Sequence, residues 1–102
     1  MNRYDTLIEF ERPHTGPANA YGEPEQTWLP FRHAWAKVER GEPQTDADPV
    51  QTKRVAYVFR FGPDPDLDEH MRVRVDQRVV SIKDLVRDAN EYIVYGEAVI
   101  HG

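Results

Sequence analysis

Proline and glycine interrupt this sequence so often that no long helix fits between them. Eight prolines and six glycines are spread over 102 residues, and the apolar segments that they separate have the length of β-strands. Within these segments apolar and polar residues alternate, as expected for strands with one buried face. The sequence therefore predicts an all-β, mainly antiparallel fold, a small β-barrel or sandwich of about six strands with long loops and at most a short helical turn.

The clearest predicted strand covers residues 55–61. Its aromatic residues Tyr57, Phe59 and Phe61 share one face, and Gly62 follows the last of them. Because side chains alternate between the two faces of a strand, we expect this aromatic face to form the core. By the same reasoning, the other strands are expected at residues 4–12, 28–39, 71–75, 78–82 and 91–101.

Four of the five segments that connect these predicted strands carry a further structural signal. Residues 14–27 are rich in Pro, Gly, Asn and Glu, which favours either a long hairpin connection or an extended arm. Residues 40–52 lose the apolar periodicity and are predicted to form a long, mobile, acidic loop. Asp76 and Gln77 are predicted to form a tight turn, although neither is the glycine that typically marks such a hairpin. Residues 83–90 are expected to be a polar connection or one helical turn.

The last predicted strand is apolar on both faces. Ile93, Tyr95 and Val99 lie opposite the face that carries Tyr92 and Val94. Either this strand lies between two layers, or its outer face contacts another subunit.

The length, the charge and the absence of cysteine limit the function further. A chain of 102 residues is expected to form one domain, residues 1–102. The net charge of −5 argues against a nonspecific nucleic-acid binder held by phosphate contacts. Without cysteine there is no disulfide framework and no thiolate ligand or nucleophile. No apolar run approaches the ~18 residues of a membrane span, and the charged N-terminus predicts synthesis in the cytosol without export.

No reaction chemistry is visible in the motifs. Asp64, Asp66 and Asp68 have the spacing that begins an EF-hand loop, but the later positions that need Gly and Glu are Glu69 and Val75. The four histidines match no ligand spacing, the single serine lacks flanking elbow glycines, and no glycine-rich phosphate loop is present. We therefore predict that the protein is not an enzyme and has no catalytic residues, no cofactor and no metal site.

The arginines of the predicted strands lie on the outer surface. Arg54 and Arg60 point away from the aromatic face, and Arg72 and Arg74 oppose the apolar residues of their own strand. A stacking platform for nucleic acid needs aromatic and basic residues on the same exposed face, so this arrangement counts against one. The arginines form either an ordinary solvated face or a contact with another protein.

The order of several short motifs resembles the phage head–tail joining family, also called head-closure, stopper or adaptor proteins. The resemblance begins with a first strand ending in Arg12-Pro13 and a Tyr21-Gly22-Glu23 turn, and continues with a Trp35-Ala36-Lys37-Val38-Glu39 segment similar to the family's Trp-Ala-x-Val-Glu signature. The later predicted strands follow in the family's order. Gln77 stands where many relatives have Gly, so the type of that turn stays open.

This resemblance implies a structural virion protein of a tailed phage or a gene-transfer particle. It implies a ring in the virion neck that closes the portal channel, retains packaged DNA and docks the tail. During assembly the protein is then located in the host cytoplasm. Its partners are then further copies of itself, the portal or adaptor ring, and tail-terminator or tail-tube proteins, with DNA contacted only by occlusion and no membrane involved. In some members the long loop after the second strand projects into the channel, which here places Glu42, Asp46 and Asp48 there.

A ring also needs two different complementary faces on each subunit. We predict that these include Arg72 and Arg74, with Ile93, Tyr95 and Val99 as an apolar contact. The alternative is a stand-alone small β-barrel module that binds nucleic acid or protein, which predicts salt-dependent oligonucleotide binding by the monomer.

Overall fold

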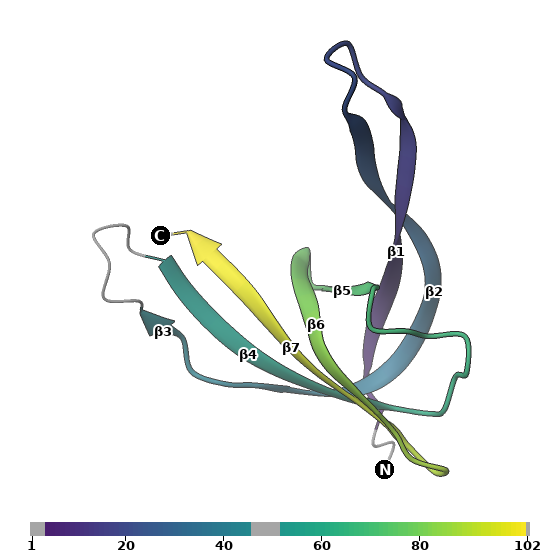
Figure 1. Cartoon of the computed structure of the whole chain (residues 1–102). Coiled ribbons are helices and arrows are strands. Elements are labelled where there is room, and N and C mark those ends of the chain that lie inside the picture. The colour runs from purple at the N-terminus through teal and green to yellow at the C-terminus, as the bar shows by residue number, and fades with distance from the viewer. Residues whose placement is uncertain (1–3, 46–51, 102) are drawn as a thin grey trace.

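The computed structural model describes residues 4–45 and 52–101, and in these ranges the regular structure is all β. Figure 1 shows strands that curve around a common interior, with one long hairpin projecting away from it. The all-β, mainly antiparallel prediction is therefore confirmed. The strands are β1 (Thr6–Ala18), β2 (Pro24–Arg40), β3 (Gln44–Thr45), β4 (Thr52–Phe61), β5 (Arg72–Val75), β6 (Arg78–Arg87) and β7 (Tyr92–His101).

Six of the strands close on themselves. They follow the order β2-β1-β5-β6-β7-β4, and an additional pairing of β2 with β4 joins the two ends. Strand β3 pairs only with β4, outside this circuit. All of the pairings are antiparallel. We call the six-stranded circuit the closed sheet. Its closure separates an interior face, which is filled by side chains, from an outer face.

The inside of the closed sheet is an aromatic core. Phe10, Phe59 and Phe61 are fully buried. The Phe61 ring meets the edges or faces of Phe10 and Tyr92 at centroid distances of 5.2 and 6.2 Å, and Tyr57 stacks on Phe59 at 5.7 Å. The prediction that the aromatic face of residues 55–61 forms the core is confirmed. Burying each such ring contributes about 1.5–3 kcal/mol relative to leaving it in water.

Strand β6 is longer than the sequence predicts. The expectation of a polar connection or helical turn at residues 83–90 is wrong, because β6 continues to Arg87 and pairs with β7. The register shifts between Ile82 and Asp84. A bulge at this point changes which side chains face inward, so Leu85 is buried opposite Val94 while its neighbours Asp84 and Val86 are exposed.

Residues 14–27 form an extended arm, one of the two alternatives that the sequence allowed. Strands β1 and β2 stay paired far beyond the closed sheet, to the pair Ala18 and Pro24, and this hairpin projects upward in Figure 1. Residues 20–27 are all exposed. The arm is a two-stranded ribbon with two free edges, so its prolines interrupt no ladder of a larger sheet.

The tip of the arm is a structured turn. The Asn19 carboxamide oxygen accepts hydrogen bonds from the backbone N–H groups of Tyr21 and Glu23, at 2.9 and 3.1 Å. Gly22 has a φ of 79°, which glycine adopts without steric cost. Both features fix the shape of the tip, although its side chains lie in water.

Part of the predicted loop at residues 40–52 is β-strand in the structure. Arg40 is the last residue of β2, and the short strand β3 pairs with Lys53 and Arg54 of β4. The reason is that β4 starts at Thr52 and β2 pairs only with its residues 57–61. The first residues of β4 are therefore available on the same edge for pairing with β3. Residues 46–51 lie outside the described residues.

The turn between β5 and β6 has left-handed backbone at both central positions. Asp76 and Gln77 have φ values of 48° and 65°. A two-residue connection with two positive φ angles is the type I′ turn, whose twist matches that of the strands it joins. The tight turn is confirmed, and non-glycine residues occupy both of its strained positions.

Candidate functional site

The predicted interface arginines of β5 converge on one buried carboxylate. Arg72 donates a hydrogen bond from Nε to Glu11 Oε1 at 2.7 Å, and Arg74 donates from Nε to Oε2 at 3.3 Å. The Arg72 guanidinium also lies over the Trp28 ring, 4.4 Å from its centroid. Glu11 is only 5% exposed and is the one buried charged residue in the described part of the chain. These arginines therefore have partners within the monomer, at the base of the arm.

The charge of Glu11 is stabilised against its own burial. Burial is the largest single influence and raises the pKa of this carboxyl group. The hydrogen bonds and positive charges of Arg72 and Arg74 act in the opposite direction and together outweigh it, so the pKa lies below its ordinary value. The three side chains form a cluster that is ionised at neutral pH.

The two outward arginines of β4 are ion-paired as well. Arg54 Nη1 lies 2.8 Å from Oε1 of Glu97 on β7, and Arg60 Nη1 lies 3.4 Å from Oε1 of Glu91, which directly precedes β7. The outer face therefore has little uncompensated positive charge at these positions. Because Tyr57, Phe59 and Phe61 are buried, β4 itself presents no aromatic ring on which nucleic-acid bases could stack.

The outer face of β7 carries apolar side chains that no other described residue covers fully. Tyr95 and Val99 are 41% and 47% exposed, and Val86 of β6 is also exposed beside its partner Ile93. Val58 of β4 lies opposite Tyr95. We call Ile93, Tyr95, Val99 and Val86 the β7 patch. The structure thus brings together the three apolar residues predicted for an interface and adds a fourth.

Three further exposed apolar side chains were not assigned to an interface by the sequence reasoning. Trp35 is 59% exposed on β2, directly opposite exposed Leu7 on β1. The signal was present in strand parity, because Ala36 is completely buried and its neighbour Trp35 must then point outward. The third is Tyr21 at the tip of the arm, which is 89% exposed.

The acidic residues predicted for a channel loop are described only in part. Glu42 is exposed and lies in the connection between β2 and β3. Asp46 and Asp48 lie outside the described residues. An open, shallow depression beside Glu42 is lined also by Arg54 and Glu97.

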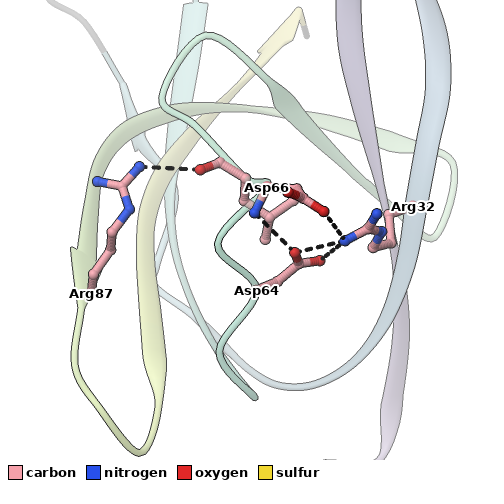
Figure 2. Close-up of polar contacts among 5 residues, drawn as sticks. Arg32, Asp64, Asp66 and Arg87 are labelled. Carbon is pink, nitrogen blue, oxygen red and sulfur yellow. Dashed lines mark hydrogen bonds and ion pairs between the residues drawn. The ribbon is translucent and has the colours of Figure 1, made fainter.

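The aspartates of the β4–β5 connection bind an arginine. Figure 2 shows Arg32 Nη1 between Asp64 and Asp66, at 2.6 Å from Asp64 Oδ1 and 3.1 Å from Asp66 Oδ2. These contacts raise the pKa of the Arg32 guanidinium, mainly through its hydrogen bonds to Asp64 and Asp66. Arg87 donates to the Leu67 carbonyl in the same connection at 3.1 Å. The carboxylates that resembled the start of a calcium loop therefore hold this connection against β2.

Two features are absent from residues 4–45 and 52–101. In these ranges no group of three or more His, Cys, Asp and Glu side chains is placed to hold a metal ion. In the same ranges there is no helix that is long and apolar enough to cross a membrane.

The model of one protein family matches almost the whole chain. The family is described as phage head completion protein, and the match covers residues 1–99. No curated protein matches the chain in sequence.

Two solved structures share the fold. A chain of the virion of a native gene transfer agent particle superposes with a TM-score of 0.80 over 100% of both chains, at 18% sequence identity. Protein SF1141 from Shigella flexneri 2a superposes with a TM-score of 0.63 over 96% of both chains, at 17% identity. At these identities the likeness establishes the common fold.

Proposed function

The chain belongs to the phage head completion protein family, and from this premise we propose that it forms a ring in the neck of a tailed phage or a gene transfer particle. Membership makes it a structural protein of the phage head. In the proposed position the ring closes the portal channel, retains the packaged DNA and offers the tail its docking site. The role is mechanical, and its partners are further copies, the portal or adaptor ring, and tail proteins.

The observation that carries the proposal is the uncovered β7 patch. The closed sheet already has a filled aromatic core, so Tyr95 and Val99 have no place inside the monomer. Apolar side chains gathered on one outer face favour contact with another protein. In a ring, one face of each subunit contacts a different face of its neighbour, and the β7 patch is the candidate for one of these two faces.

The acidic segment between β2 and β4 supports the proposed closing of the channel. Glu42 is exposed there, and Asp46 and Asp48 add two carboxylates in the sequence that follows. Carboxylates repel DNA phosphates, so a loop of this composition blocks a channel without adhering to the DNA that later passes through it.

Arg72 and Arg74 have a smaller place in the proposed interface than the sequence suggested. Both are engaged by Glu11, and about 44% of the Arg74 side chain stays exposed. Reversing their charges would place three carboxylates together at the base of the arm, which destabilises the monomer before any interface is tested. The β7 patch is therefore the better place for a test.

The test replaces Tyr95 and Val99 together with lysine in the particle that carries this chain. We expect the variant to fold, because both side chains are exposed, but to be missing from purified heads. Those heads should lose DNA to added nuclease and carry no tails in electron micrographs. Ser81→Lys, an exposed position on the neighbouring strand β6, serves as the control. Heads that lack the chain altogether but keep their DNA and their tails would contradict the proposed function.

A further inference from the structure

A cavity of about 280 Å³ opens at one end of the closed sheet. Its walls come from the start of β1, the end of β2, the middle of β4 and the β5–β6 turn, and include Thr6, Arg40, Tyr57, Asp76 and Arg78. We call it the arginine pocket. It lies at the edge of the aromatic core, so the pocket is lined by polar groups as well as by Val38 and Val75.

The arginine pocket contains two guanidinium groups without a carboxylate partner. Among the described residues, neither Arg40 nor Arg78 makes an ion pair, whereas five other arginines of the chain do. Arg78 instead donates a hydrogen bond to the Tyr57 hydroxyl at 3.1 Å. Two arginines beside a tyrosine and a threonine hydroxyl form a donor set suited to a carboxylate or phosphate group.

The arm carries the complementary charge. Glu23 and Glu25 flank Pro24 at its tip, both are exposed, and neither makes an ion pair within the described residues. The Asn19 turn holds the backbone of Glu23 in one conformation. An acidic group on a preformed turn loses little conformational entropy when it is bound.

The arm and the arginine pocket lie at opposite ends of the same two strands. The arm continues from the end of β1 and the start of β2, while Thr6 begins β1 and Arg40 ends β2. Residues 13–18 alone extend the arm by roughly 20 Å at the usual rise of a strand. The arm of one chain therefore points away from its own pocket, and only another copy can bring an arm tip to it.

We propose that the arginine pocket binds the acidic arm tip of a second copy, with Arg40 and Arg78 contacting the carboxylates of Glu23 and Glu25. Each copy then offers one arm and one pocket, which is a heterologous contact of the kind that closes into rings. The inference rests on the ring of the proposed function and specifies how neighbouring subunits recognise one another. A DNA phosphate is the competing ligand, but the chain's net charge of −5 repels a polyanion such as DNA more strongly than the two carboxylates of an arm tip.

Site-specific crosslinking tests this contact directly. The chain has no cysteine, so a short bismaleimide joins only the thiols that are introduced. We expect the double variant Gln26→Cys with Gln77→Cys, which keeps all four contacting charges, to give a ladder of crosslinked oligomers in concentrated purified protein or in purified particles. Both positions are exposed, and Gln77 lies in the β5–β6 turn between the pocket residues Asp76 and Arg78. The control keeps Gln26→Cys and replaces Gln77→Cys with Lys83→Cys, an exposed position on β6 outside the pocket, and should give no ladder.

Charge reversal provides the second measurement. Arg40→Glu, or Glu23→Arg with Glu25→Arg, should weaken self-association by roughly tenfold or more in sedimentation experiments, because each removes charge-assisted hydrogen bonds. Combining the two sets in one chain should restore it, and Lys83→Glu should have no effect.

The outcomes separate this inference from the proposed function. No ladder in either sample overturns the arm contact, and if particles then contain the chain the neck function stands. A ladder from purified protein supports the contact even if the chain is missing from particles, which counts against the neck function. Binding of a labelled oligonucleotide that Arg40→Glu abolishes, without any ladder, assigns the pocket to phosphate and overturns the contact.

Discussion

The closed sheet and the arm are built from the same two strands, but they are stabilised in different ways. Inside the closed sheet, β1 and β2 contribute to a core whose aromatic rings are fully buried. Beyond Glu11 the same strands pair only with each other, and residues 20–27 are all exposed. An isolated two-stranded ribbon is marginally stable in water. The stability of the arm therefore depends on its junction with the closed sheet, whereas the stability of the closed sheet does not depend on the arm.

The largest effect is expected from the core of the closed sheet. Phe61→Ala removes the ring that contacts both Phe10 and Tyr92, and it should lower the free energy of unfolding by about 3–5 kcal/mol. Urea unfolding followed by circular dichroism measures this loss. Tyr21→Ala at the tip of the arm is the matched aromatic truncation and should leave the unfolding midpoint unchanged. Equal losses from the two variants would show that the arm belongs to the same cooperative unit.

A smaller effect is expected at the junction between the two regions. Glu11→Gln leaves Arg72 and Arg74 without their charged partner, and it should lower the free energy of unfolding by about 1–3 kcal/mol at pH 7. Glu25→Gln on the arm is the control and should have no effect on stability.

The Glu11 contribution should also depend on pH. Its pKa in the folded chain lies below the ordinary value of 4.5, so the unfolded state binds the proton first as the pH falls. The stabilisation is therefore complete above the ordinary value and is lost as the pH drops through the folded pKa. The gap between wild type and Glu11→Gln should narrow between pH 6 and pH 3. A gap that stays constant over this range would contradict the assignment.

The smallest effects are expected at the two turns with left-handed backbone. Gln77→Gly relieves a positive φ in the β5–β6 turn of the closed sheet, and it should raise the free energy of unfolding by about 0.5–1 kcal/mol. Gly22→Ala introduces the same kind of strain at the tip of the arm. It should shift the global unfolding midpoint hardly at all, because the arm lies outside the cooperative core. Thermal melts of both variants check the pair, and a clear loss for Gly22→Ala would remove the distinction between the regions.

The sequence predicted the elements of the closed sheet better than the junctions between them. Alternation in residues 55–61 and 91–101 correctly indicated the buried face of each strand, since this pattern needs only the period of the strand itself. It failed at residues 83–90, where the bulge beside Ile82 turns Leu85 inward. For residues 14–27 the sequence left two alternatives open, because Pro and Gly are compatible with either a long hairpin connection or an extended arm.

The candidate interface residues were likewise predicted in part from the sequence. Strand parity placed Ile93, Tyr95 and Val99 on one face of the last strand and left open whether a second layer covers that face. In the structure Tyr95 and Val99 are exposed and Ile93 is half-buried. Parity also placed Arg72 outside, but it carried no information that Glu11, 61 positions away, lies against it. The arginine pocket had no counterpart in the sequence reasoning, because Arg40 and Arg78 meet only when β2 and the β5–β6 turn reach the same end of the closed sheet.

By itself, the sequence determined that this protein is all β, which face of each clear strand is buried, and that its motifs resemble a phage head–tail joining family. These properties are local, because each depends on a residue and its neighbours along the chain. Only the tertiary structure decided that six strands close into a circuit, that Arg54, Arg60, Arg72 and Arg74 are ion-paired, and that an acidic arm and the arginine pocket lie at opposite ends of one hairpin. Backbone hydrogen bonds are the same for every residue type except proline, so strand partners and register are selected by the packing of the whole core and not by any one segment.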